Sequence, residues 1–234
     1  MFKVTISLNQ ASAQALLASG YRLLAFKAVR NSDQAGKVVL WYAGAIAGLE
    51  FDLAWNAAYS AYATRSPLDP PTIDAFFPIT SGQILTITDA LGSASVAGGG
   101  DPLAITINNV SGTQFEAGLA QAAQASGTQP LSAFPLYGSG FQLITPVERI
   151  LLAFSTQAWQ LGQVVTTLAT TSQRIGMLLF AGTGALLVDM GTAGDTTRQV
   201  QFDINGGWSW GEAVWGSAVD PTAPLAPLLI LPDI

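Results

Sequence analysis

Short segments in which apolar and polar residues alternate, or in which every residue is apolar, recur along the whole chain. Successive side chains of a strand point to opposite faces, so a strict alternation such as that of residues 2–8 is typical of a half-buried strand. Turn-forming residues separate these segments. The pattern predicts an all-β fold, a β-sandwich of ten or more strands. The expected strands cover residues 2–8, 21–29, 38–42, 84–88, 103–108, 114–119, 149–155, 164–168, 177–180, 185–188 and 200–204.

One segment near the N-terminus has a helical pattern. Residues 9–20 are rich in alanine, start with a capping residue, Asn9, and end at Gly20, which predicts a short N-terminal helix. Residues 54–64 fit a helix or a strand. We favour the strand, because an alternation of apolar residues starts already at Leu49.

Three short sequences recur in the same order, although at unequal spacing. Residues 23–26 return as 151–154, residues 36–39 as 162–165, and residues 51–53 as 202–204. Two related β-units are one interpretation, and chance similarity among strands is the other. We therefore expect a single compact β-domain over residues 1–234, with pseudo-halves 1–78 and 79–234 if the repeat is real.

The chain has no cysteine and no histidine, which excludes several kinds of chemistry. Disulfides, thiolate nucleophiles, zinc fingers, iron–sulfur clusters and Ser-His-Asp machinery all need one of these residues. Any catalysis would depend on carboxylates, lysine, tyrosine or hydroxyl groups. We expect no cofactor and a protein that is not an enzyme.

Only 10% of the residues are charged, and the formal net charge is −6. This charge argues against nucleic acid as a partner, because a phosphate backbone attracts clustered lysine and arginine. Residues 1–65 carry six basic and three acidic residues, a local charge of +3 that we read as scattered solvating charge. Few charges mean little repulsion between molecules, which favours association into a homo-oligomer.

The N-terminal residues lack the pattern of a signal peptide, and the most apolar stretches, 38–49 and 175–188, are too short for a spanning helix. We expect a protein that is cytoplasmic as synthesised, with release by a route without a classical signal peptide left open. Residues 175–188 read as two apolar runs around a glycine turn. They predict a core hairpin, and a segment that enters lipid is the alternative.

Two carboxylates, Glu50 and Asp52, lie two residues apart on one face of an expected strand. The pattern is similar to the opening of the E-x-D-x-x-E strand of laminarinase-type jelly-roll hydrolases, a likeness of three positions. Trp55 stands where the second glutamate of that motif, its general acid, would be. We expect a solvent-facing polar strand face, with Arg22 or Lys27 nearby, and keep a glycosidase as an alternative.

A second acidic set, Asp189, Asp195 and Asp203, brackets a glycine-containing loop. Calcium binds carboxylate oxygens, but the spacing is not that of an EF-hand, and carboxylates are common in turns. These residues are weak metal candidates, and no metal site is expected.

Three of the six tryptophans, Trp208, Trp210 and Trp215, fall within eight residues. Indole rings beside polar groups can stack on sugar rings or sit at a lipid headgroup boundary, whereas packing in the sandwich core is the plain alternative. Asn205 and Glu212 are the expected hydrogen-bonding partners for ligand hydroxyls.

These observations favour a non-enzymatic, lectin-like recognition protein that binds a neutral glycan or a lipid headgroup through its tryptophans. Three alternatives remain: a membrane-active, pore-forming cytolysin on the same sandwich, which would act at a membrane surface; a carboxylate glycosidase; and a self-assembling storage protein. The comparison of this chain with lectins and β-sandwich cytolysins rests on the expected fold class alone, because the sequence shares no motif with them.

Overall fold

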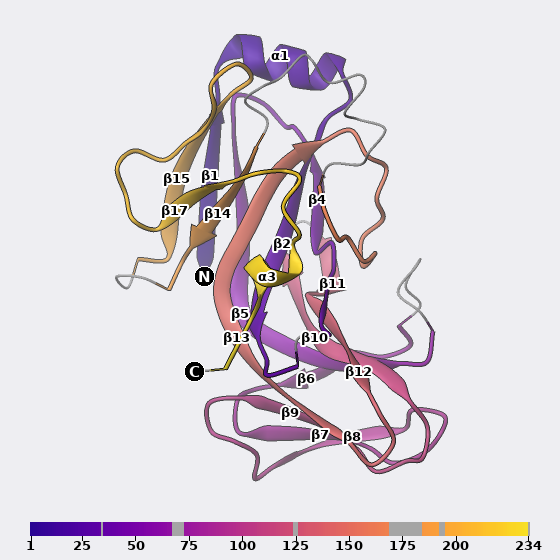
Figure 1. Cartoon of the computed structure of the whole chain (residues 1–234). Helices are drawn as coiled ribbons and strands as arrows, with labels where there is room; N and C mark the ends of the chain where they lie inside the picture. The colour runs from indigo at the N-terminus through magenta and orange to yellow at the C-terminus, as the bar shows by residue number, and fades with distance from the viewer. Residues whose placement is uncertain (34, 67–72, 124–125, 169–183, 192–194, 234) are drawn as a thin grey trace.

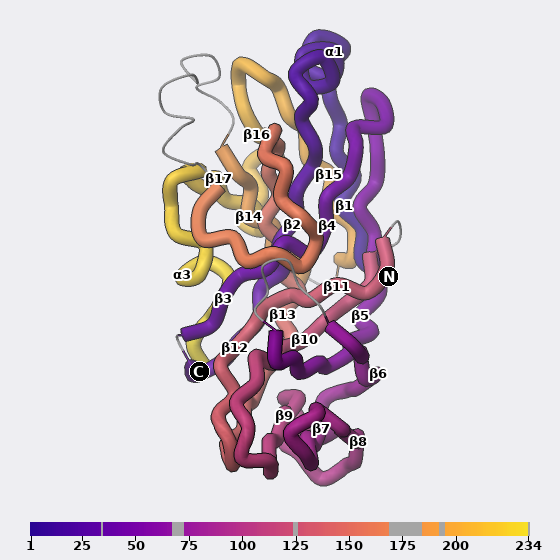
Figure 2. The backbone as a smooth tube through the Cα atoms, turned by 90° about the vertical axis from the view of Figure 1, so that its right-hand side faces the viewer, coloured from indigo at the N-terminus to yellow at the C-terminus, as the bar shows by residue number. Residues whose placement is uncertain are grey.

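The computed structural model describes residues 1–33, 35–66, 73–123, 126–168, 184–191 and 195–233. Over these residues the protein is an all-β sandwich of two mixed sheets with nine strands each, as the alternation of apolar residues predicted, and it carries the short N-terminal helix expected from residues 9–20. The two sheets lie face to face over most of an elongated molecule (Figures 1 and 2).

The first sheet joins the N-terminal strand to strands from the middle and the end of the chain. Its order is β16-β15-β1-β5-β10-β12-β3, with β6 beside β5 and β11 beside β10. The strands are β1 (Phe2–Leu8), β3 (Lys37–Val38), β5 (Glu50–Thr64), β6 (Phe77–Ile79), β10 (Phe115–Ala123), β11 (Ser126–Pro130), β12 (Ser132–Leu136), β15 (Thr197–Asp203) and β16 (Gly207–Ser209).

The second sheet has the order β17-β14-β13-β9-β7-β8, and β2, flanked by β4 and β18, also pairs with β13. Its strands are β2 (Arg22–Arg30), β4 (Tyr42–Ala45), β7 (Gln83–Ile87), β8 (Ala94–Gly98), β9 (Ile105–Asn109), β13 (Phe141–Ser155), β14 (Ala185–Asp189), β17 (Gly216–Val219) and β18 (Ile230–Leu231).

Two strands of 15 residues, β5 and β13, account for the elongated shape. The first half of β5 pairs with β1 and the second half with β10. The strand β13 pairs with β9 through its first residues and with β2 and β14 through its last, and its pairing with β2 shifts register between Pro146 and Ile150. Each long strand therefore connects the end near the N-terminal helix to the end that holds β7, β8 and β9 (Figure 1).

Burial follows the position of each strand in the sandwich. In β15 exposed and buried residues alternate, so one face packs on the core and the other meets solvent. In β2 every residue between Arg22 and Arg30 is buried. This strand is covered on both faces, since a second helix, α3 (Ala226–Leu229), also packs against it.

The helix α1 (Gln10–Ala18) lies at one end of the sandwich, next to β1 and β15 (Figure 1). The side chain of Asn9 caps it by accepting a hydrogen bond from the amide of Ser12, as predicted. Leu16 is buried, and the hydroxyl of Ser12 accepts a hydrogen bond from the amide of Ile204. Neither described helix has the length and apolar character needed to cross a membrane.

Two of the expected strands differ from the structure. Residues 38–42 do not form one strand, because β3 pairs in the first sheet and β4 in the second, and the chain passes between the layers at residues 39–41. Residues 164–168 form no strand. Val164 makes a single bridge to Val39. The expected strand 177–180, and most of the expected hairpin 175–188, lie outside the described residues.

The ambiguous segment 54–64 is part of the strand β5, so the preferred interpretation is confirmed. None of the expected strand ranges covers β6, β8, β11, β12, β16, β17 or β18. The recurring sequences 23–26 and 151–154 pair with each other antiparallel, with Leu23 opposite Phe154. Both sheets contain strands from residues 1–78 and strands from residues 79–234.

Candidate ligand-binding sites

Trp208, in β16, packs against the core. Its ring stacks on Phe154 at a centroid distance of 5.2 Å and an interplanar angle of 4°, and it meets Phe202 edge-on at 5.1 Å. Its indole N–H donates a hydrogen bond to the carbonyl of Gly184. One face of the Trp208 ring and its indole N–H are therefore already in contact with other residues of the protein.

Trp210 and Trp215 lie on either side of the following turn, and both are half-buried. The indole N–H of Trp210 donates to the carbonyl of Ala213, and its ring covers Gly216, where a Cβ atom would come within 2.5 Å of it. The ring of Trp215 packs under the guanidinium of Arg198, 5.2 Å from its centroid.

Trp215 also lines a pocket of about 260 Å³ on the strands β13, β14 and β17. The pocket contains the ion pair between Arg149 and Asp189, whose nitrogen and oxygen are 2.9 Å apart, together with Ser217. The Nε of Arg149 is buried and has no partner among the described residues.

The two polar residues expected beside the tryptophans lie apart from this pocket. Asn205 and Glu212 are exposed in turns, and neither lines the pocket of Trp215. The amide of Asn205 donates to the carboxylate of Asp203. Of the five residues of the predicted binding surface, Trp215 alone lines a described pocket, so the structure does not bring the set together around one cavity.

Glu50 and Asp52 lie on the solvent face of β5, opposite Ser7 and Thr5 of β1. Asp52 accepts hydrogen bonds from the hydroxyl of Thr5 at 2.6 Å and from Lys3 at 3.3 Å, and these bonds, that of Thr5 first, lower the pKa of Asp52. Neither carboxylate lines a described pocket. The prediction that Arg22 or Lys27 lies near these two carboxylates is wrong, because both basic residues bind partners elsewhere.

The three acidic residues considered for a metal lie in different surroundings. Asp189 pairs with Arg149, Asp195 lies 3.7 Å from Arg198, and Asp203 accepts hydrogen bonds from two backbone amides and from Asn9. Those backbone bonds hold the pKa of Asp203 below its usual value. In the described parts of the chain, no three acidic residues form a group that could hold a metal ion. Asp203 instead lines a polar pocket of about 450 Å³ with Ser7 and other residues of β1 and β15.

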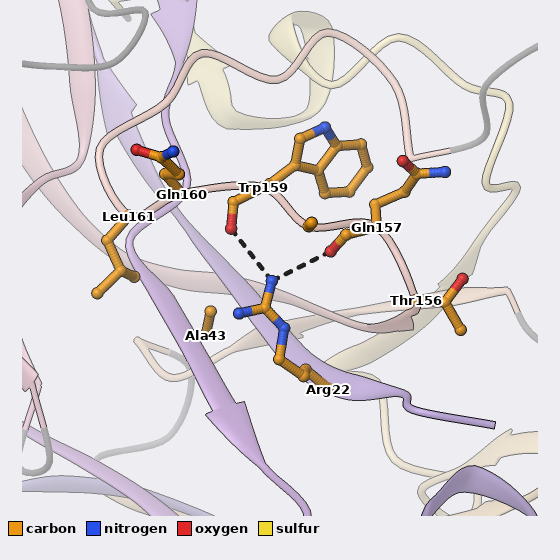
Figure 3. A pocket seen from close by; sticks show the side chains of 8 residues that line it. Arg22, Ala43, Thr156, Gln157, Trp159, Gln160 and Leu161 are labelled. Carbon is orange, nitrogen blue, oxygen red and sulfur yellow. Dashed lines mark hydrogen bonds between the residues drawn. The ribbon is translucent and has the colours of Figure 1, made fainter. Parts of the chain in front are cut away.

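A pocket of about 520 Å³ lies between the strands β2 and β4 and the segment 156–161 that follows β13 (Figure 3). Its side chains are an indole, a guanidinium, two amides, one hydroxyl and three small or aliphatic groups. They belong to Trp159, Arg22, Gln157, Gln160, Thr156, Ala43, Ala158 and Leu161.

Arg22 connects this segment to the sheet. It starts β2, opposite Ser155 of β13 and Ala45 of β4. One amino nitrogen of its guanidinium donates to the carbonyls of Gln157 and Trp159, both at 3.1 Å, as the dashed lines in Figure 3 mark. Trp159 is half-buried and packs against the core. The segment 156–161 is therefore held by the hydrogen bonds of Arg22 and by the packing of Trp159.

The sequence holds a weak signal for this pocket, although none of the predicted site residues lines it. Trp159 stands in the segment Gln157-Ala158-Trp159-Gln160, where an aromatic ring is flanked by amide side chains in a turn region. Its partner Arg22 is 137 positions away, and such a separation hides the pair from any local pattern.

Comparisons with known proteins give no match: no family model, no curated protein and no solved structure matches this chain.

Proposed function

We propose that the protein is a non-enzymatic recognition protein that binds a glycan in the pocket of Arg22 and Trp159. One observation carries the proposal: a partly exposed indole, a guanidinium, two amides and a hydroxyl line the same pocket. An apolar ring beside a few convergent polar groups is what a sugar needs, because its C–H face stacks on the ring and its hydroxyls accept and donate hydrogen bonds.

The size and composition of the pocket support this class of ligand. A volume of about 520 Å³ falls in the range of small-molecule sites, about 300–1,000 Å³. The side chains of Gln157 and Gln160 each offer two donors and one acceptor, which suits neighbouring hydroxyls of a sugar. No carboxylate lines this pocket, so the side chains that hydrolyse glycosidic bonds in pairs are absent from its described lining.

The proposal keeps the class of ligand expected from the sequence but moves the binding site from the tryptophans near the C-terminus to Trp159. The indole N–H groups of Trp208 and Trp210 donate hydrogen bonds to carbonyls of the protein. Trp159 instead lines the pocket of about 520 Å³. Trp215 lines a smaller one and provides a matched control.

The test is a screen of the full-length protein against an oligosaccharide panel, followed by titration calorimetry with Trp159→Ala and Trp215→Ala. Loss of one stacking ring should weaken binding by about tenfold in Trp159→Ala, since an aromatic contact contributes about 0.5–1.5 kcal/mol beyond the buried apolar area, which is lost as well. Trp215→Ala should bind as the wild type does.

Two results would overturn the proposal. One is the absence of binding to any oligosaccharide, and the other is binding that Trp159→Ala leaves unchanged. Vesicle leakage is measured in parallel, because permeabilisation of vesicles without sugar binding would favour the membrane-active alternative.

A further inference from the structure

We infer that the glycan bound in this pocket carries an anionic group, a carboxylate or a sulfate, and that Arg22 recognises it. The inference rests on the proposed function and adds the chemical class of the ligand. Three features support it: the fixed position of the guanidinium, the donors left over, and the absence of a compensating carboxylate in the lining.

The guanidinium of Arg22 is held in place before any ligand arrives. Its two hydrogen bonds to the carbonyls of Gln157 and Trp159 use one amino nitrogen, and the residue itself is anchored between two neighbouring strands. A donor that is already oriented loses little conformational entropy on binding.

Three donors remain after those two bonds. A guanidinium has about five N–H groups, of which two are used here, so the second amino group and the Nε–H are left. In Figure 3 the second amino group points away from the two carbonyls, toward Ala43. Each of these remaining N–H groups can donate a charge-assisted hydrogen bond to an oxygen of a carboxylate or a sulfate.

The charge of Arg22 has no counter-charge in the pocket. The eight lining residues include no aspartate and no glutamate, and across the described residues no ion pair to Arg22 occurs. Among the other cations of the described residues, five have a carboxylate partner, namely Lys3, Lys27, Lys37, Arg149 and Arg198. Arg30 and Arg65 also form no ion pair there, but neither lines a pocket described above. A half-buried cation facing a cavity lined by neutral groups favours an anionic ligand.

A sugar is favoured over a phosphate-bearing lipid headgroup by the rest of the lining. Trp159 offers an apolar face for a ring, and Gln157, Gln160 and Thr156 offer hydrogen bonds to hydroxyls. The net charge of −6 gives no general attraction to anions, so the selectivity has to come from this local arrangement.

The test compares ligands that differ only in charge. Oligogalacturonides are titrated against their methyl esters, and sulfated galactan oligosaccharides against the neutral desulfated forms, with the wild-type protein and with Arg22→Gln. We expect the wild type to prefer the charged member of a pair at least about tenfold, because a hydrogen bond to a charged oxygen is stronger than one to a neutral oxygen. Arg22→Gln should bind both members with similar affinity.

Two control variants separate the alternatives. Arg149→Gln removes a guanidinium from the pocket of Trp215 and should keep the preference of the wild type. Arg22→Lys keeps the charge without the N–H directions that the two carbonyls fix in the guanidinium, and it should show a reduced preference. If Arg22→Gln does not fold, the inference is tested by comparing charged and neutral ligands on the wild type and on Arg22→Lys. A preference for the charged ligand that is equal in these two proteins would then overturn it.

Each outcome has a distinct meaning. Equal affinity for charged and neutral members, or a preference that survives in Arg22→Gln, overturns this inference and leaves glycan binding intact. Absence of binding to both members of every pair overturns the proposed function itself. Binding to phosphatidylserine vesicles but to no oligosaccharide overturns both, and it assigns the pocket to a lipid headgroup.

Discussion

Lys27 of β2 donates a hydrogen bond of 2.6 Å to the carboxylate of Glu148 in β13, and this ion pair faces the opposite sheet. Two side chains of β5 donate to the same carboxylate, the indole N–H of Trp55 at 2.8 Å and the hydroxyl of Tyr59. The ammonium also lies over the ring of Trp55, 4.4 Å from its centroid. Polar contacts thus connect the two layers inside a largely apolar core.

The first prediction concerns the coupling within this pair. Lys27→Met leaves Glu148 without its cation, and Glu148→Gln leaves a lysine that is 1% exposed without its carboxylate. Each change should lower the free energy of unfolding by about 3–5 kcal/mol. The double variant should lose clearly less than the sum, because it leaves no unpaired charge. Urea denaturation of the four proteins measures this cycle, and additive losses would contradict it.

The second prediction is a pH dependence with a defined sign. Burial lowers the pKa of Lys27 to about 8, although the carboxylate of Glu148 acts in the opposite direction. Between that value and the pKa of an unfolded lysine, about 10.4, the unfolded chain binds more protons. The contribution of Lys27 to the free energy of unfolding therefore rises with pH in this window, by at most about 1.4 kcal/mol per pH unit.

The comparison protein for this experiment is Lys27→Met. Its urea midpoint should lack the rise between pH 8 and 10 that Lys27 gives the wild type. Above about pH 10 the free energy of unfolding should fall in both proteins, because burial raises the pKa of Tyr59 and only the unfolded chain then releases that proton. Parallel pH profiles of the two proteins would rule out the assignment to Lys27.

The third prediction concerns the close contact between β10 and β12. A Cβ atom at Gly118 would lie 2.0 Å from the carbonyl oxygen of Ser132, which also accepts the hydrogen bond of the buried Tyr62 hydroxyl. Gly118→Ala should destabilise the protein by about 1–3 kcal/mol or more, because the strand has to shift and Tyr62 loses its acceptor. The exposed Gly98, with nothing within 4 Å of its Cβ position, is the control. An equal loss in Gly98→Ala would refute the steric explanation.

The fourth prediction tests the cap of α1. Asn9 accepts from the amide of Ser12 at 2.7 Å and donates to the carboxylate of Asp203. Asn9→Ala should cost about 1 kcal/mol, whereas Asn9→Ser keeps the cap acceptor and should recover most of it. Thermal unfolding gives the stability, and hydrogen exchange at the Ser12 amide reports the cap directly. Unchanged exchange in Asn9→Ala would speak against a capping role.

Much of the fold could be predicted because its signals are local. The alternation in residues 2–8 and the cap at Asn9 each specify their own element. The segment 38–42 could not be resolved in the same way. Its residues are apolar throughout, and the change of sheet near Trp41 depends on partners that lie elsewhere in the chain.

The candidate sites were harder to predict for the same physical reason. Arg22 and Lys27 have their partners 121 or more positions away, at Glu148 and in the segment 156–161, so composition suggested the nearer carboxylates instead. The tryptophan cluster was visible in the sequence, but whether a ring packs or faces a pocket depends on tertiary neighbours such as Phe154.

The position of β1 has a consequence for how the chain folds. This strand lies between β5 and β15, and its parallel partner begins at Thr197, nearly the whole chain length away. Contacts of such high sequence separation are slow to form because the loop between them has to close first. During synthesis one edge of β1 stays without its neighbour until residues 197–203 have emerged, which leaves an open template for strand pairing with other molecules.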